Sequence, residues 1–265
     1  MRKKLLAMLL CVGLMLIFLP QVVQAADVYT YIDENGETKT TEGLTVTPIT
    51  ADTATLTNGW YMVNSDVTRN GTITVSGSVH LILADGFTLT VTGSNNSAGV
   101  QISTGNSLTI YGQTNGTGTL QAQGGANGAG IGGNSNQSGG AILINSGTVH
   151  ATGGIDGAGI GGGKGGAGGT IQINGGILTA TGGDGPVIDE YGRKLGGGAG
   201  IGGGYQGAGG TITISGGTVN AISGQTDVCA GAGIGGGYGR DGGRITISGG
   251  IVTARSTQEG AGIGQ

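Results

Sequence analysis

Tyr205 and Tyr238 are the residues whose spacing most directly suggests binding chemistry. Each lies four residues after the isoleucine of a Gly-Ala-Gly-Ile tetrapeptide, and the spacing that follows is the same in both repeats. We therefore expect the two rings to lie one above the other, with Lys164 and Ser135 continuing the file. One interpretation is ring stacking that stabilises an outer corner. The functional interpretation is an aromatic platform against which sugar rings pack.

A second group of candidates lies in a 12-residue insertion within the segment from Asp184 to Gly196. Insertions at one corner of a repeat place variable side chains on one face of the array. The insertion is interpreted either as a solvated loop or as a ligand-contacting loop. Its candidates for binding carbohydrate are Asp189, Tyr191 and Arg193, beside Glu190 and Lys194.

Patterns that would indicate catalysis or metal binding are weak. His80 and His150 are the only histidines, and no acidic residue lies near either in the sequence. Gly157–Gly162 fits G-x-G-x-x-G, but it recurs with the repeat and no helix is expected after it, as a dinucleotide site requires. Residues 236–244 approach a calcium-binding nonapeptide but lack its apolar residue and a tandem copy. The sequence therefore predicts no catalytic residue, no metal site and no cofactor.

The composition restricts the fold class. Glycine accounts for 65 of 265 residues, whereas only 10% are charged and three are proline. Too little proline excludes collagen, low charge with many β-branched residues argues against disorder, and so much glycine argues against helices. Without residues 1–25, the chain contains eight Lys and Arg and 15 Asp and Glu, which gives a net charge of −7. A basic surface for nucleic acid is therefore not expected.

The elements that must position these residues form a repeat. Gly-Ala-Gly-Ile begins at positions 128, 157, 198, 231 and 260, and the apolar anchors between copies follow spacings of 11 and 7 residues. Three short segments per repeat alternate with period 2, which is typical of strands. The pattern predicts an all-β, single-stranded parallel β-helix with three strands per coil of about 29 residues, and a right-handed one is expected.

Two further features follow from this arrangement. A file of short polar residues should form a hydrogen-bond ladder at the end of the second strand: Asn145, Asn174, Ser215 and Ser248. Asn35-Gly36 is a strong signal for a two-residue hairpin turn.

The chain divides into three expected parts. Residues 1–25 have the basic start and short apolar run of a secretory signal peptide, residues 26–58 form an N-terminal hairpin cap, and residues 59–265 form a β-helix of about six coils. No membrane segment is expected after removal of the signal. The chain stops one strand into a new coil, which favours a fragment truncated at its C-terminus. End-to-end self-association through this open coil is the alternative.

Several sequence segments resemble those of a known class of protein. Gly59–Val63, Val79–Gly86, Ser107–Gly112 and the Gly-Ala-Gly-Ile-Gly-Gly repeats resemble secreted cell-surface β-helix repeat proteins of Gram-positive bacteria, which are similar to carbohydrate-binding, pectate-lyase-like β-helix modules. The resemblance implies an extracellular location and contact with polysaccharide or cell-surface glycan, and it carries over no binding residue.

Three alternative functions are therefore considered, in decreasing order of preference. The first is a secreted, non-enzymatic module that contacts polysaccharide at a cell surface. The second is a purely structural stalk or adhesin spacer. The third is a degenerate polysaccharide lyase.

Overall fold

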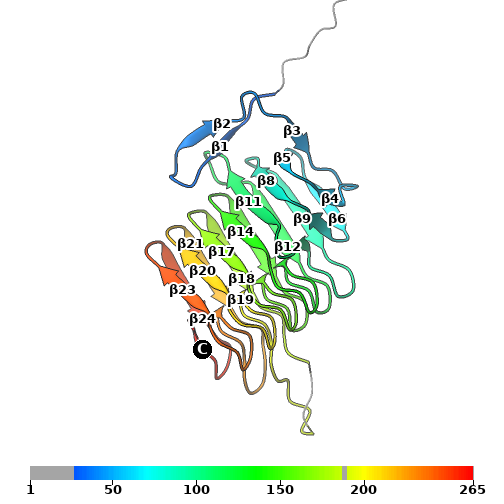
Figure 1. The fold of residues 1–265 in the computed structure, drawn as a ribbon, viewed down its shortest axis with the longest axis vertical. Helices are drawn as coiled ribbons and strands as arrows, with labels where there is room; N and C mark the ends of the chain where they lie inside the picture. Colours follow the sequence, from blue (N-terminus) through cyan, green and yellow to red (C-terminus); the bar gives the residue numbers. More distant parts are fainter. Residues whose placement is uncertain (1–26, 187–189, 265) are drawn as a thin grey trace, which may run out of the picture.

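The computed structural model describes residues 27–186 and 190–264, which form a parallel β-helix with a hairpin at its N-terminal end (Figure 1). The predicted signal peptide lies outside the described residues. Within them, no helix is long and apolar enough to cross a membrane.

Three parallel sheets, here named B, C and D, run along the length of the molecule. The chain visits them in the order B, D, C in each coil, so that each strand pairs with its counterpart one coil away. Sheet B consists of β3 (Val46–Pro48), β5 (Gly59–Val63), β8 (Ser78–Leu83), β11 (Ser107–Gly112), β14 (Ala141–Ile144), β17 (Thr170–Ile173), β20 (Thr211–Ile214) and β23 (Arg244–Ile247). Sheet C consists of β4 (Thr55–Leu56), β7 (Ile73–Val75), β10 (Val100–Ile102), β13 (Ile131–Gly132), β16 (Ile160–Gly161), β19 (Ile201–Gly202) and β22 (Ile234–Gly235). Sheet D consists of β6 (Val67–Asn70), β9 (Thr88–Thr92), β12 (Thr119–Gln123), β15 (Thr148–Thr152), β18 (Ile177–Thr181), β21 (Thr218–Ile222) and β24 (Ile251–Arg255).

The register confirms the repeat read from the sequence. Ile160 pairs with Ile201, and Ile201 pairs with Ile234, so the tetrapeptide isoleucines form one file. The two other predicted anchors form files of their own in sheets B and D, as in the pairs Ile171–Ile212 and Leu178–Val219. Equivalent residues therefore stack vertically despite the insertion.

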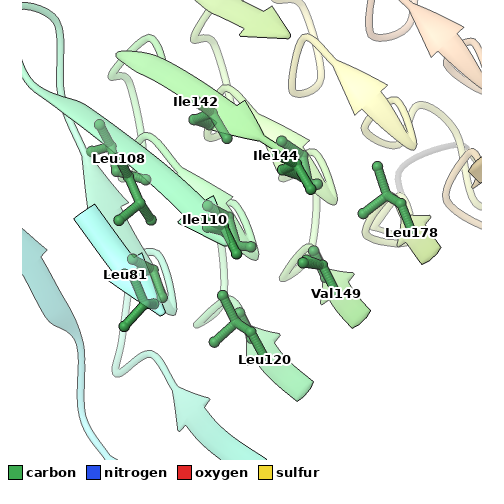
Figure 2. Packing of buried hydrophobic residues seen from close by; sticks show 14 of the residues in the cluster. Leu81, Leu108, Ile110, Leu120, Ile142, Ile144, Val149 and Leu178 are labelled. Carbon is green, nitrogen blue, oxygen red and sulfur yellow. The ribbon is translucent and has the colours of Figure 1, made fainter. Parts of the chain in front are cut away.

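The core consists of these apolar files (Figure 2). Figure 2 shows Ile110 beside Ile144 from neighbouring strands of sheet B, facing Leu120 and Val149 of sheet D. All four side chains are buried. Because burial of such a side chain contributes roughly 2 kcal/mol, no single coil can offset its own ordering cost. Stacking of coils supplies the rest, as in other repeat proteins.

The polar file beside sheet B also forms. The Asn174 side-chain amide donates to Oδ1 of Asn145 at 2.7 Å, and the Ser215 hydroxyl donates to Oδ1 of Asn174 at 2.9 Å. Ser248 instead directs its hydroxyl toward the carbonyl of Ile214 at 3.5 Å. The predicted ladder therefore runs from Asn145 to Ser215 and ends there.

The N-terminal hairpin forms with a different turn from the predicted one. Strands β1 (Thr30–Ile32) and β2 (Thr38–Thr40) are antiparallel, and the N–H of Asp33 donates to the carbonyl of Glu37. These bonds enclose a three-residue loop that ends at Gly36, whose φ is +78°. Positive φ at the last loop residue suits a three-residue hairpin, so the two-residue prediction was wrong.

Aromatic side chains attach this hairpin to the outer face of sheet B. The Tyr31 ring lies 5.0 Å from Trp60 and 4.9 Å from Tyr111, measured between centroids, and Trp60 stacks on His80 at 4.4 Å. The hydroxyl of Ser146 donates to the carbonyl of Ile32 at 3.0 Å. The hairpin therefore lies against the side of the helix, while β3 and β4, which precede residue 59, already pair within sheets B and C.

The two-residue strands β13, β16, β19 and β22 of sheet C require glycine at their second position. Gly202 has a φ of +133°, and a Cβ placed there would overlap the carbonyl oxygen of Gly235 in the next coil. Gly161 and Gly132 stand in the same file with the same geometry. Such backbone conformations are essentially confined to glycine.

Replacing Gly202 by Ala tests this constraint, with Gly239→Ala as the matched control. Gly239 also has positive φ, but a Cβ there meets no atom within 4 Å. We expect the control to lose about 1 kcal/mol from backbone strain. Gly202→Ala adds about 1–3 kcal/mol of overpacking. Urea unfolding followed by circular dichroism measures both, and equal midpoints for the two variants would contradict the close-approach argument.

Candidate functional site

The short strand of sheet C lies between two outward bends of the chain, here named lobe 1 and lobe 2. In the coil of β16, lobe 1 is residues 153–158 and lobe 2 is residues 162–168. Each is closed by a turn, in which the N–H of Gly157 donates to the carbonyl of Gly154 and the N–H of Gly166 donates to that of Gly163, both at 2.8 Å. Because the strand between them has only two residues, the lobes lie side by side.

The lobes of successive coils interlock into one ridge along the molecule. The N–H of Lys164 in lobe 2 donates to the carbonyl of Asn127 at 2.9 Å, and the N–H of Tyr205 donates to that of Asp156 at 2.7 Å. In each case the acceptor belongs to lobe 1 of the preceding coil. We call the interlocked lobes the ridge.

The predicted aromatic file stands on this ridge. The Tyr205 and Tyr238 rings are stacked with centroids 6.0 Å apart and an interplanar angle of 6°. The Lys164 ammonium lies 5.6 Å from the Tyr205 centroid. Lys164 belongs to the coil before Tyr205 and Tyr238 to the coil after it, so opposite faces of the Tyr205 ring are covered. A ligand could therefore reach the ring only at an edge or at its hydroxyl.

An ion pair between a buried carboxylate and a partly exposed lysine supports the same file, and the sequence analysis missed it. Nζ of Lys164 lies 2.8 Å from Oδ2 of Asp156, whose side chain is 0% exposed. Burial raises the pKa of the Asp156 carboxyl, and the Lys164 ammonium offsets this only in part. Asp156 has a φ of +65°, a conformation that Asp and Asn tolerate better than most residues. The two residues are eight positions apart on different lobes, so the pairing follows from the folded path of the chain.

The insertion is anchored to the ridge at both ends. Asp184 accepts a hydrogen bond from the N–H of Gln225 at 2.8 Å, and Asp227 accepts one from the N–H of Lys194 at 2.7 Å. At the far end, a Cβ on Gly196 would overlap the edge of the Tyr205 ring. The insertion therefore packs directly against the aromatic file.

The remaining predicted site residues are not part of the stack. Tyr191 is 75% exposed, and the Arg193 guanidinium lies 5.2 Å from its ring centroid. Asp189 lies outside the described residues. Cys229 is half-buried, and its thiol beside the phenol raises the pKa of Tyr238. The structure thus brings Tyr205 and Tyr238 together and makes a separate pair of Tyr191 and Arg193.

Two grooves flank the ridge, and sequence reasoning found neither. The CB groove, about 480 Å³, lies between lobe 2 and sheet B and is lined by Thr104–Ser107, Ser138–Ala141, Ala167, Gly169, Thr170, Gly210 and Thr211. The D groove lies on sheet D and lobe 1 and consists of two adjoining depressions, about 200 and 390 Å³, that share Gln123 and Thr152. It is lined by Thr90, Val91, Gln121–Ala126, His150, Thr152–Ile155 and Thr181–Asp184.

Among residues 27–186 and 190–264, no cluster of three or more His, Cys, Asp and Glu could hold a metal ion. The side chains of the ridge and grooves offer hydroxyls, amides, an imidazole, aromatic edges and the ion pairs Lys164–Asp156 and Lys194–Asp184.

We expect substitution of the two members of the ion pair to have unequal effects on stability. Lys164→Met leaves the buried Asp156 carboxylate without its partner, so we expect a loss of about 3 kcal/mol at pH 7. Asp156→Asn removes the buried charge and leaves a solvated lysine, so we expect no loss. Differential scanning fluorimetry and urea titration would measure both, and a large loss for Asp156→Asn would show that the pair is net stabilising.

The stability difference between Asp156→Asn and the wild type should depend on pH in a defined direction. Since the folded-state pKa of Asp156 is raised above its ordinary value of 3.8, the protonated carboxyl stabilises the wild-type protein at low pH. That contribution is lost as pH rises through the raised pKa. Asp156→Asn should therefore match the wild type below pH 3.8 and exceed it at neutral pH.

Comparison with known proteins supports the fold. A family model described as a beta helix repeat matches residues 142–164, 212–238 and 245–264. No curated protein and no solved structure matches the chain significantly. Each matched segment starts in a strand of sheet B, passes through sheet D and reaches the ridge. The family model and the structure therefore agree on a parallel β-helix repeat fold.

Proposed function

We propose that the protein is a secreted, non-enzymatic cell-surface module that binds polysaccharide along the D groove. The observation that carries this proposal is the shape and lining of that groove. It crosses successive coils, so it runs along the helix axis and offers polar side chains at equivalent positions of each coil. A linear polymer with a repeating unit suits such a surface.

The polar side chains of the groove stand in two parallel files. Thr90, Gln121 and His150 are in register in adjacent strands of sheet D. Gln123 and Thr152 form part of the neighbouring file. The outward positions of a strand carry side chains that stand roughly perpendicular to the sheet. Hydroxyl, amide and imidazole groups therefore present donors and acceptors at regular intervals to a hydroxyl-rich ligand.

Backbone contacts hold one of these groups in place. Nε2 of Gln123 donates to the carbonyls of Gly124 and Gly153 at 3.3 and 3.2 Å. The amide is thereby oriented before a ligand arrives, which lowers the ordering cost of binding. Ile155, 49% exposed on lobe 1, adds apolar surface at the rim for the C–H faces of a sugar.

The charges of the groove favour an uncharged glycan. Asp184 is the only Asp, Glu, Lys or Arg among its described lining residues. The chain without residues 1–25 carries a net charge of −7. An acidic polysaccharide would be repelled over the screening length of about 8–10 Å at physiological salt.

A structural spacer is the second candidate, and the aromatic file favours it. The faces of Tyr205 are already occupied by Lys164 and Tyr238. Such a file stabilises the ridge without a ligand. The two candidates differ in whether the isolated protein binds glycan.

Blocking the D groove separates these candidates. We expect Thr152→Arg with Thr181→Arg to lower affinity for a neutral polysaccharide at least about tenfold, which corresponds to 1.4 kcal/mol. Gln172→Arg with Thr213→Arg, on the outer face of sheet B outside both grooves, is the matched control and should change affinity less than about twofold. Affinity electrophoresis in xylan, mannan, β-glucan, pectin and alginate gels measures this.

Three results would count against the proposal. Absence of wild-type binding to every polysaccharide in the panel favours the spacer. Equal binding by the blocked variant would move the site elsewhere. Unsaturated sugar product, detected by ultraviolet absorbance with or without calcium, would indicate a lyase.

The aromatic file has its own test. Tyr205→Phe with Tyr238→Phe keeps the stack but removes both hydroxyls, whereas the double Ala variant removes the stack as well. If ring edges on the ridge contact glycan, affinity should fall in the order wild type, double Phe, double Ala. Full affinity in a folded double Ala variant would assign the file to stability alone. The stack itself should be worth about 1 kcal/mol in urea unfolding.

A further inference from the structure

The CB groove is a second concave surface that the proposed function does not use. At about 480 Å³ it is larger than either depression of the D groove, and its lining comes from four successive coils. It therefore also runs along the helix axis. Its described lining residues contain no charged side chain.

Hydroxyl groups are available along this groove. Ser107, Ala141, Thr170 and Thr211 form one outward file of sheet B, because each pairs with the next in parallel register. Thr170 and Thr211 are exposed. Across the described residues, the hydroxyls of Thr104, Thr170 and Thr211 make no hydrogen bond to the protein, so they can serve a ligand.

The opposite wall of the groove is preorganised. The Ser138 hydroxyl accepts a hydrogen bond from the N–H of Ala167 at 3.1 Å, which ties lobe 2 of one coil to the next and leaves the serine proton free to donate. In the groove floor, Gly169 and Gly210 both have positive φ, and a Cβ at either would overlap a carbonyl of the preceding coil. The floor must therefore stay open backbone without side chains.

The ridge separates the two grooves. No residue lines both, and the interlocked lobes with Lys164, Tyr205 and Tyr238 stand between them. One ligand chain in the D groove leaves the CB groove accessible. Both grooves run along the same axis and both offer hydroxyl-type contacts without basic side chains.

We propose that the CB groove is a second binding site for uncharged polysaccharide, so that one module bridges two glycan chains on opposite sides of the ridge. This inference rests on the proposed function of the D groove. The rigid stack of coils holds the two sites at a constant separation. A bridging module would link neighbouring chains of a glycan layer and would gain avidity there, since the second contact is made at high effective concentration.

A sandwich assay tests the bridge. Beads carrying the neutral polysaccharide that binds most tightly among xylan, mannan and β-glucan are loaded with protein, washed, and exposed to the same polysaccharide in soluble fluorescent form. We expect the wild type to capture the label. The CB-blocked variant Thr170→Arg with Thr211→Arg should still load onto beads but capture at least tenfold less label. The D-blocked variant Thr152→Arg with Thr181→Arg should load less protein, because its affinity is lower, and should also capture at least tenfold less label.

The controls separate failure of the inference from failure of the proposed function. Gln172→Arg with Thr213→Arg should capture label as the wild type does, and all variants should keep the wild-type circular dichroism spectrum and melting midpoint. Capture by the CB-blocked variant at the wild-type level would overturn the bridge while leaving the D groove intact. Wild-type protein that loads onto beads but captures no label would do the same. Failure of the wild type to load would overturn both proposals.

Discussion

The close approach of successive backbones in sheet C is the constraint on which the rest of the structure depends. Gly161, Gly202 and Gly235 stand in one file, with positive φ and with carbonyl oxygens where a Cβ would project. Only glycine fits this position, and it lets a two-residue strand turn outward on both sides. Both lobes, and hence the ridge and the grooves, follow from that geometry.

A surface built this way has a restricted chemistry. The corners are largely glycine backbone whose N–H and carbonyl groups bond to the next coil, so binding groups must come from short outward files. Among the described residues, Thr, Gln, Ser, one Ala and one His occupy the files that line the grooves. These groups suit a hydroxyl-rich, uncharged polymer better than an ionic ligand, which would need compensating charge. The same repetition that stabilises the fold makes any binding surface linear.

The exceptions to the repeat show where the fold departs from plain stacking. Asp156 places a carboxylate inside the ridge, where an Asn stands in the preceding coil, and Lys164 from lobe 2 pairs with it. Trp60, His80 and Tyr111 form an aromatic surface on sheet B that would be exposed without the hairpin, and Tyr31 packs against it. Each irregular residue has a partner from another segment, as expected where a large polar or aromatic group leaves the regular pattern.

Residue spacing was enough to predict the parallel β-helix, the stacking of Ile160 on Ile201 and Ile234, and the Tyr205–Tyr238 file. These depend only on spacing along the chain, because parallel pairing converts a constant spacing into vertical alignment. The Asp156–Lys164 pair, the position of the hairpin and both grooves could be found only in the folded structure. Those features depend on how far the lobes bend outward and on which lobe of one coil meets the next. The spacing of the repeat does not fix the distance between lobe 1 of one coil and lobe 2 of the next. These lobes lie on opposite sides of the sheet C strand, so only the folded path of the chain brings them together.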